Sequence, residues 1–490
     1  MATNDNNPTA AASRQPTAVQ FNHIPRDILY TIASKLPPKE FVRTSVLSRA
    51  WRRPTWQTCP RLTFRLRECD IDRAFWYDHV WRFIDDVDIV LREHRGKVVG
   101  TLRVQVESIV GFVPVRFPYS AIDNLVRFAI ASRTKNLALD LKPPTRWRTY
   151  GADDRYPFPF HLFDDDTMST PCLQNLQLSF ASLKPPPPSH YKGFPNLRKL
   201  HLQASHVGSK GLQRVLSRCC SLEWLHLDRC HIHDDVDDDE LAVAAPTLPR
   251  LRYLRVSYGK LTKIEFNAMN LATFEYNGDF APIHLIHSTK LQGANIRYNT
   301  EIFQEHTLVP LLKGIPRVQN LTLNARLGAI PLLEKRYWLQ DSPLLKFSNL
   351  KHLQLIVRIC HREDFKHILY SSSSFLKATP FIEKLEIHFR SIYGWFDEVG
   401  PSREDLGQCK CNNYLKSILI TGFRALKGQV EFLLHAVETA PALEVLRVEI
   451  DRYPSSLHQQ CEEAEEAKQC ARTSLSSVLS QDVTFDVVII

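Results

Sequence analysis

Several features that would mark whole classes of protein are scarce or missing in this sequence. Its 490 residues include 17 glycines, too few for a collagen-like or glycine-linker chain. No run of about 18 consecutive apolar residues occurs, so we expect no transmembrane helix. Residues 1–20 are polar and lack the apolar core of a secretory signal peptide. We therefore expect a protein of the nucleus, the cytoplasm or both.

A large net charge and a regular cysteine pattern are also lacking. The chain has 62 Lys and Arg residues against 53 Asp and Glu residues, which gives a net charge of +9. A nucleic-acid binder concentrates positive charge on one face, so this small excess predicts no nucleic-acid partner. The 11 cysteines are odd in number and irregularly spaced, which does not indicate a disulfide scaffold. Apolar residues make up 44% of the chain, which excludes a largely disordered protein.

Sequence motifs for catalysis are not found. Residues 208–211 (GSKG) lack the order of a phosphate-binding loop, and no G-x-S-x-G sequence occurs. His361 and His367 do not form an H-E-x-x-H pair. Cysteines and histidines cluster between Cys219 and His233, which offers a zinc site as one interpretation. We predict no enzyme activity and no cofactor.

The most prominent feature of the sequence is an internal repeat. From about residue 135 the unit Leu-x-x-apolar-x-apolar recurs, and successive clear copies start 20 to 33 residues apart. Leucine-rich repeats have periods of about 20–29 residues, so we predict a leucine-rich-repeat solenoid with insertions in its later units. A leucine-rich α/β domain is the alternative, but it does not explain why one pattern marks every predicted strand. The clear copies start at Leu173, Leu197, Leu222, Leu251, Leu271, Leu291, Val318, Leu350, Ile382, Leu415 and Leu443.

The repeat predicts which side chains face outward. One strand from each repeat joins a curved parallel sheet, and helices or loops cover its convex face, so the fold class is α/β. Side chains alternate across a strand, so the residues between the apolar positions point away from the core. Among them, Trp224, His226, Tyr253 and Arg255 include residue types that are enriched at binding hot spots. We predict a substrate-binding patch there; the alternative is an ordinary solvated sheet surface.

The repeat also explains part of the cysteine cluster. Cys230 occupies the position that takes Asn or Cys in such repeats, so we expect it buried in the turn after the strand. His226 should point the opposite way. We therefore favour a packing role over zinc binding and predict no metal site.

Further elements flank the repeats. Residues 75–95 have the spacing of an amphipathic helix, and residues 101–106 alternate like a strand. Near the C-terminus, residues 462–468 are typical of an exposed helix, and residues 483–489 alternate like a strand that closes the open edge of the sheet. The acidic run at 234–240 is interpreted as a solvated loop.

Two segments outside the central repeats carry family motifs. Residues 24–29 read Ile-Pro-Arg-Asp-Ile-Leu and residues 44–53 read Thr-Ser-Val-Leu-Ser-Arg-Ala-Trp-Arg-Arg. This region closely resembles the plant F-box. Three later segments, 411–423, 430–432 and 440–444, resemble the FBD motif of plant F-box proteins. The order of F-box, leucine-rich repeats and FBD also matches that family.

The resemblance implies the substrate-recognition subunit of a Skp–cullin–F-box E3 ubiquitin ligase. In that family the F-box docks on a Skp-type adaptor, which links it to cullin and RING subunits, and the repeats hold a protein substrate. The chain itself would be non-catalytic and would bind neither nucleic acid nor membrane. The resemblance assigns adaptor binding to Pro25, Ile28, Leu29, Ile32, Leu36, Pro37, Val46, Leu47 and Trp51.

The predicted domain organisation has five segments. We expect a disordered arm at 1–20, the F-box at 21–67, a linker helix leading into the repeats at 68–134, leucine-rich repeats at 135–410, and FBD-like repeats with a cap at 411–490.

Three other interpretations remain open. The F-box helices could serve only as a structural cap on the solenoid. The chain could be an interaction scaffold that no longer assembles a ligase, which Arg26 and Ala50 favour because they depart from the F-box pattern. A small-molecule receptor would need basic residues converging on one concave spot, and the sequence pattern reveals no such concentration.

Overall fold

A computed structural model describes most of the repeat region and little of the F-box. Of the nine residues assigned to adaptor binding, Pro25 and Ile28 are described and the other seven lie outside. The acidic run at 234–240 also lies outside. The described residues are 25, 28, 59–67, 76–94, 98–107, 119–141, 154–163, 172–187, 191–232, 248–258, 261, 263–285, 287–302, 313–327, 347–359, 375–391, 412–451 and 457–490.

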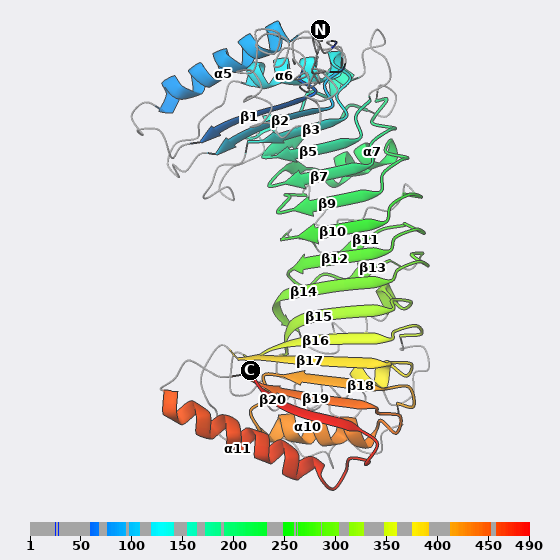
Figure 1. Cartoon of the computed structure of the whole chain (residues 1–490). Coiled ribbons are helices and arrows are strands. Elements are labelled where there is room, and N and C mark those ends of the chain that lie inside the picture. Colours follow the sequence, from blue (N-terminus) through cyan, green and yellow to red (C-terminus); the bar gives the residue numbers. More distant parts are fainter. Residues whose placement is uncertain are drawn as a thin grey trace, which may run out of the picture.

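A single sheet of 15 parallel strands organises the fold, and its strands follow one another in chain order (Figure 1). This confirms the predicted α/β solenoid with a large parallel sheet. The strands are β1 (Arg61–Arg67), β2 (Thr101–Glu107), β3 (Asn136–Asp140), β5 (Asn175–Ser179), β7 (Lys199–Gln203), β9 (Trp224–Asp228), β10 (Tyr253–Ser257), β12 (Thr273–Gly278), β14 (Gly293–Ile302), β15 (Asn320–Leu327), β16 (His352–Ile359), β17 (Lys384–Ser391), β18 (Ser417–Thr421), β19 (Val445–Ile450) and β20 (Thr484–Ile489).

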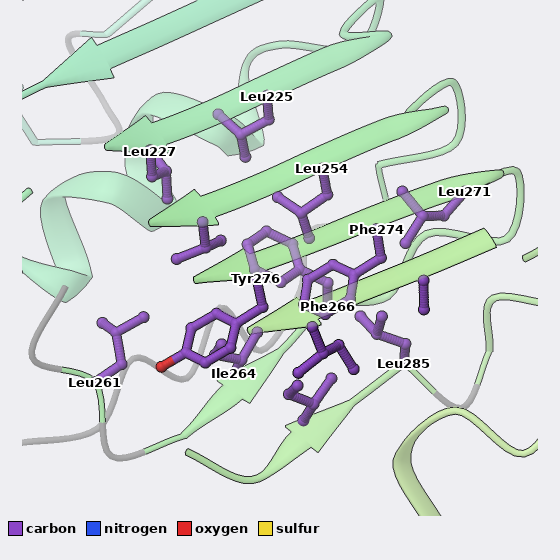
Figure 2. Packing of buried hydrophobic residues seen from close by; sticks show 14 of the residues in the cluster. Leu225, Leu227, Leu254, Leu261, Ile264, Phe266, Leu271, Phe274, Tyr276 and Leu285 are labelled. Carbon is purple, nitrogen blue, oxygen red and sulfur yellow. The ribbon is translucent and has the colours of Figure 1, made fainter. Parts of the chain in front are cut away.

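The repeat pattern produces the sheet because its apolar positions all face the core. In every clear copy, the three apolar residues of the unit are buried. Leu225 of β9, Leu254 of β10 and Phe274 of β12 occupy equivalent positions in neighbouring strands. Figure 2 shows them packed with residues of the outer layer such as Phe266 and Leu285. Stacking therefore buries side chains that no single repeat could cover alone.

The outer layer, behind the sheet, differs between the ends and the middle. Helices α5 (Trp76–Glu93) and α6 (Tyr119–Ala131) lie at the N-terminal end, and α10 (Lys427–Glu438) and α11 (Leu457–Leu475) lie at the C-terminal end (Figure 1). The middle uses thinner elements: η5 (Phe160–Phe163), α7 (Ser209–Ser217), a small sheet of β4 (Tyr156–Pro157), β6 (Ala181–Leu183) and β8 (His206–Val207), and the pair β11 (Ile264–Glu265) and β13 (Ile283–His284).

The sheet begins earlier than the repeat pattern suggested. Residues 61–67, placed in the F-box by sequence, form β1 and pair with β2 in parallel register. Leu62 and Leu66 are buried on the core side, because this short segment alternates like the later strands. The solenoid sheet therefore starts at Arg61 rather than near residue 135.

The C-terminal expectations are confirmed for the strand and corrected for the helix. Strand β20 pairs in parallel with β19 and is the last strand of the sheet, as expected for a closing strand. Helix α11 is longer than the predicted exposed helix, and Ala464, Ala467 and Ala471 on one side of it are buried. These small side chains allow the helix to lie close against the end of the sheet.

Candidate functional site

The outward face of the 15-stranded sheet carries the candidate site. Strand β9 illustrates its origin: Leu225 and Leu227 are buried, whereas Trp224 and His226 alternate with them and are half-buried. Parallel register then sets outward residues of neighbouring strands side by side. Trp224 stands between Lys199 and Tyr253, and His226 stands between His201 and Arg255. The structure thus brings together the four residues predicted as a substrate-binding patch.

We call His201, Trp224, His226 and Tyr253 the aromatic patch. The rings of Trp224 and Tyr253 are stacked, with centroids 5.3 Å apart and planes 6° from parallel. The rings of His201 and His226 are stacked at 4.2 Å and 3°. Trp224 meets His226 edge-on at 5.4 Å. The four rings therefore form one continuous aromatic surface across three strands.

His201 is the member that the sequence analysis left out of the predicted patch. It lies on β7, and register places it opposite His226. The available signal was its position in the repeat, because His201 and His226 occupy the same place between the second and third apolar residues of their units. Shared repeat positions on adjacent strands predict such a pair.

Arg255 borders the aromatic patch and is held by a neighbouring carboxylate. Its Nη1 lies 3.4 Å from Oε2 of Glu275. The Arg255 side chain is 43% exposed and the Glu275 side chain is 31% exposed. Burial raises the pKa of the Tyr253 hydroxyl, and its hydrogen bond with Glu275 raises it further. Exposed ion pairs add little to stability, so Arg255 can exchange Glu275 for a partner group at small cost.

His226 is kept neutral by its surroundings. Its pKa is lowered to about 4, chiefly by burial and then by the positive charges of His201 and Arg255, whereas Asp228 acts in the opposite direction. Its Nε2 is buried and has no hydrogen-bond partner among the described residues. The His226 ring is therefore uncharged at neutral pH and is suited to apolar and aromatic contacts.

A second cluster on the same face is built around one carboxylate. The carboxylate of Glu386 on β17 lies 2.6 Å from Nζ of Lys384 and 3.2 Å from Nε2 of His352. Gln354 donates a hydrogen bond to it at 3.0 Å, and Nε2 of His388 lies 3.5 Å away. We call these five residues the Glu386 network. The sequence analysis placed them on the outward face but did not single them out.

The charge of Glu386 is stabilised by the groups around it. Burial alone raises the pKa of this carboxyl group, but the hydrogen bond from Lys384 and the positive fields of His352 and His388 outweigh it, so the pKa is lowered. Only 11% of the side chain is exposed. Both carboxylate oxygens have partners within the network, because Oε1 lies beside Lys384 and Oε2 accepts from Gln354.

Cys230 lies where the repeat predicted. It is buried after β9, and its Sγ donates to the carbonyl of Leu202 at 3.4 Å. Burial raises its pKa to about 12, which keeps the thiol protonated, whereas a zinc ligand must be a thiolate. Within the described ranges, no group of three or more metal-ligating side chains is found.

The described part of the F-box is small. Ile28 donates its backbone N–H to the carbonyl of Pro25 at 3.1 Å, as in the first turn of a helix. Both residues are exposed, and Ile28 is 49% exposed. Their assignment to adaptor binding stays a prediction, as does that of the seven residues outside the described ranges.

Comparison with known families identifies the class of protein. The F-box domain model matches residues 21–53, and a leucine-rich-repeat domain model matches residues 90–486. The protein is therefore an F-box protein with a leucine-rich-repeat solenoid, as the motifs and the parallel sheet indicated. The repeat model is that of the At1g61320/AtMIF1 LRR domain, and the chain belongs to this family. Neither matched family is a family of enzymes.

Similar proteins come from Arabidopsis thaliana. The putative F-box/LRR-repeat protein At5g54820 is 25% identical over 372 residues, which cover 71% of this chain and 72% of the relative. The F-box/FBD/LRR-repeat protein At1g13570 is 22% identical over 449 residues, covering 87% and 90%. Both names include the F-box and the repeat, and the second also includes the FBD, which confirms the predicted family resemblance. No helix among the described residues is long and apolar enough to cross a membrane.

Proposed function

We propose that this protein is the substrate-recognition subunit of a Skp–cullin–F-box E3 ubiquitin ligase. The observation that carries the proposal is the combination of an F-box match at residues 21–53 with a repeat sheet whose outward face bears the aromatic patch. One part offers an adaptor contact and the other a partner contact. The two lie in separate segments of the chain, as a bridging subunit requires.

In the proposed mechanism the chain works by proximity. The F-box docks on a Skp-type adaptor, which joins it to cullin and RING subunits, and the repeat face holds a protein substrate near the ubiquitin-carrying enzyme. Tethering raises the effective concentration of substrate lysines without a catalytic side chain from this chain. We propose the nucleus, the cytoplasm or both as its site of action.

The aromatic patch is the proposed substrate anchor. Trp and Tyr supply large contact areas at small entropic cost, and Arg pairs with acceptor groups, which is why these types dominate binding hot spots. Trp224 and Tyr253 hold each other in place, so little ring freedom is lost when a partner covers them.

Adaptor binding tests the proposal directly. Full-length protein should bind a purified Skp-type adaptor, and the triple variant Pro25→Ala/Leu29→Ala/Trp51→Ala should not. Trp224→Ala is the matched control, because it changes the outward face of the repeats and should keep adaptor binding. A well-folded full-length chain that fails to bind the adaptor would refute the ligase proposal.

An interaction scaffold is the second candidate. Arg26 and Ala50 depart from the F-box pattern, and Arg26 reverses a charge at the start of the first F-box helix. A scaffold would bind partners through the aromatic patch but would not bind the adaptor. The same binding experiment therefore separates the two functions, and Arg26→Asp should strengthen adaptor binding if the charge reversal weakens it.

A further inference from the structure

Strand β20 has one edge that no other described strand pairs with. It is the last strand in the order of the 15-stranded sheet, and its neighbour is β19 (Figure 1). The backbone N–H of Thr484, at the start of β20, donates to the carbonyl of Glu444 at 2.9 Å, on the β19 side. Backbone groups of successive residues point to opposite sides of a strand. The N–H and C=O groups of Phe485, Val487 and Ile489 therefore point to the open edge.

The core is covered less completely at β20 than one strand earlier. Leu446 and Ile450 of β19 are 0% and 2% exposed. Their register partners Phe485 and Ile489 pack against the same core but remain partly exposed. Side chains on the same face of neighbouring strands pack against one another, so a further strand would cover both residues. The edge therefore suits a strand with apolar side chains at alternate positions.

The charge near this edge is negative. Residues 476–490 include Asp482 and Asp486 but no Lys, Arg or His. Both aspartates are exposed, and neither side chain has an ion pair with another residue that the structure describes. Arg447 lies opposite Asp486 in the register, but it is bound to Glu449 at 2.8 Å. A basic side chain on an added strand would lie beside Asp486 and balance its charge.

The two end strands of the sheet differ in how well their charges discourage pairing. Strand β1 has the sequence RLTFRLR, and its Arg61 and Arg65 side chains are exposed. Charged side chains on an end strand discourage pairing with other chains. Strand β20 has the sequence TFDVVI, in which Asp486 is the single charged residue. The edge of β20 is therefore the less protected of the two.

We propose that the open edge of β20 binds an extended segment of a partner protein as an additional strand of the sheet. The segment has apolar side chains at alternate positions and Lys or Arg between them. Backbone hydrogen bonds with Phe485, Val487 and Ile489 provide affinity, and the side chains of the segment provide selectivity. The sheet order separates this edge from the aromatic patch on β7, β9 and β10.

A peptide of known fit serves as the probe. It has the sequence of residues 60–67 of this chain, PRLTFRLR, because β1 already shows the required alternation as an end strand of the same sheet. Its arginines also match the negative charge at β20. We expect saturable binding of the labelled peptide to the full-length chain, measured by fluorescence anisotropy. A well-folded chain that does not bind it would overturn the proposal.

Two N-methylated forms of the peptide test the backbone pairing. One carries methyl groups on the amides of its three apolar residues, and the other on the amides of the residues that precede them. An added strand turns only one of these sets of amides towards β20. One form should therefore bind about tenfold or more weakly, and the other should stay within about twofold of the parent peptide. The form that loses affinity reports the direction of the strand, whereas equal affinities of the two forms would refute strand pairing.

Reversal of one charge tests the electrostatic part. Asp486→Lys should weaken binding of the basic peptide by about fivefold at low salt, because exposed ion pairs contribute modestly. Asp85→Lys is the matched control: Asp85 is exposed on α5, at the other end of the molecule, and the substitution changes the net charge equally. Melting temperatures of both variants should stay near that of the unmodified chain. Equal weakening in the two variants would indicate unspecific attraction and overturn the proposal.

A second copy of this chain is the other possible occupant. Sedimentation of the full-length chain over a range of concentrations detects self-association. Self-association that the peptide competes away would assign the edge to a second copy and overturn its assignment to a partner protein. The edge of β20 does not depend on the F-box, so a failed adaptor experiment leaves this proposal standing, and the reverse also holds.

Discussion

The two faces of the sheet show how one set of strands serves two purposes. On the core face, the repeat places Leu225, Leu254 and Leu353 in equivalent buried positions. On the outward face, Trp224 and Lys384 occupy the same register row and have little in common. Burial allows only apolar side chains of suitable volume, whereas exposed positions tolerate most types. The residues that stabilise the fold therefore recur in every repeat, whereas the residues available for binding differ from one repeat to the next.

The outward face itself contains two kinds of cluster. Ring stacking holds the aromatic patch together, and burial favours the neutral form of its His226 ring. Ion pairs and hydrogen bonds hold the Glu386 network together, and its carboxylate is best charged. Acid therefore acts unfavourably on both, in one case by adding charge and in the other by removing it.

The largest expected effect separates core from outward face. Leu225→Ala should lower the free energy of unfolding by about 2–5 kcal/mol, because it leaves a cavity in a fully buried stack. Lys199→Ala, on the exposed side of the neighbouring strand β7, should change it by less than about 0.5 kcal/mol. Urea unfolding measures both. Equal losses in the two variants would contradict the division between faces.

Substitution of Trp224 should affect partner binding more than stability. Trp224→Ala should weaken partner binding by about 2–4 kcal/mol. It should lower the free energy of unfolding by only about 1 kcal/mol, because the ring is half-buried and stacks on the Tyr253 ring. Partners recovered with the full-length chain and quantified by mass spectrometry provide the measurement. Unchanged recovery with Trp224→Ala would remove the aromatic patch from the proposed binding site.

Two glycines sharpen the comparison at the level of the backbone. Gly422 has φ +66°, and a Cβ there would lie 2.2 Å from the carbonyl oxygen of Phe389. Gly422→Ala should therefore cost about 1–3 kcal/mol of stability. A Cβ at Gly293, on the outward face of β14, would meet nothing within 4 Å, so Gly293→Ala should be neutral or stabilising. Thermal unfolding of the two variants distinguishes them, and a harmless Gly422→Ala would refute the steric argument.

The smallest expected effect is a pH dependence from His226. Its folded-state pKa is about 4, below the ordinary value of about 6.5, so between these values the unfolded chain binds more protons. Stability should fall as pH falls through this window and stay constant above it. Because the side chain is partly exposed, the contribution is about 1 kcal/mol. His226→Asn should lose less stability than the unmodified chain between pH 7 and pH 4.5; an identical slope would contradict the assignment.

Sequence reasoning located the strands well because their signal is local. The unit starting at Leu222 contains its own evidence: Leu225 and Leu227 alternate with polar residues, and burial follows from that alternation. The first strand was missed for a related reason. Residues 61–67 have the alternation, but no preceding Leu-x-x element marks them as a repeat, so they were grouped with the F-box segment before them.

The candidate sites depended on information that is not local. Trp224, His226, Tyr253 and Arg255 were selected by residue type, but the stacking of His226 on His201 requires β7 and β9 to be paired in that register. The Glu386 network likewise draws His352 and Gln354 from β16 and Lys384 from β17. Gln354 and Glu386, 32 positions apart, become neighbours only because the intervening chain returns each strand to the same sheet.

The amino-acid order alone was sufficient for the solenoid architecture and its core-facing leucines, because hydrophobic spacing along one strand already determines which side is buried. The F-box class was indicated separately, by the resemblance of residues 24–29 and 44–53 to that motif. The arrangement of the outward side chains was set by folding. Pairing of strands places Arg358 beside Arg390, and the register shift in β14 presents the Tyr298 carbonyl that holds Arg358. Contacts between strands depend on loop length and register, and these are fixed only when all the repeats pack together.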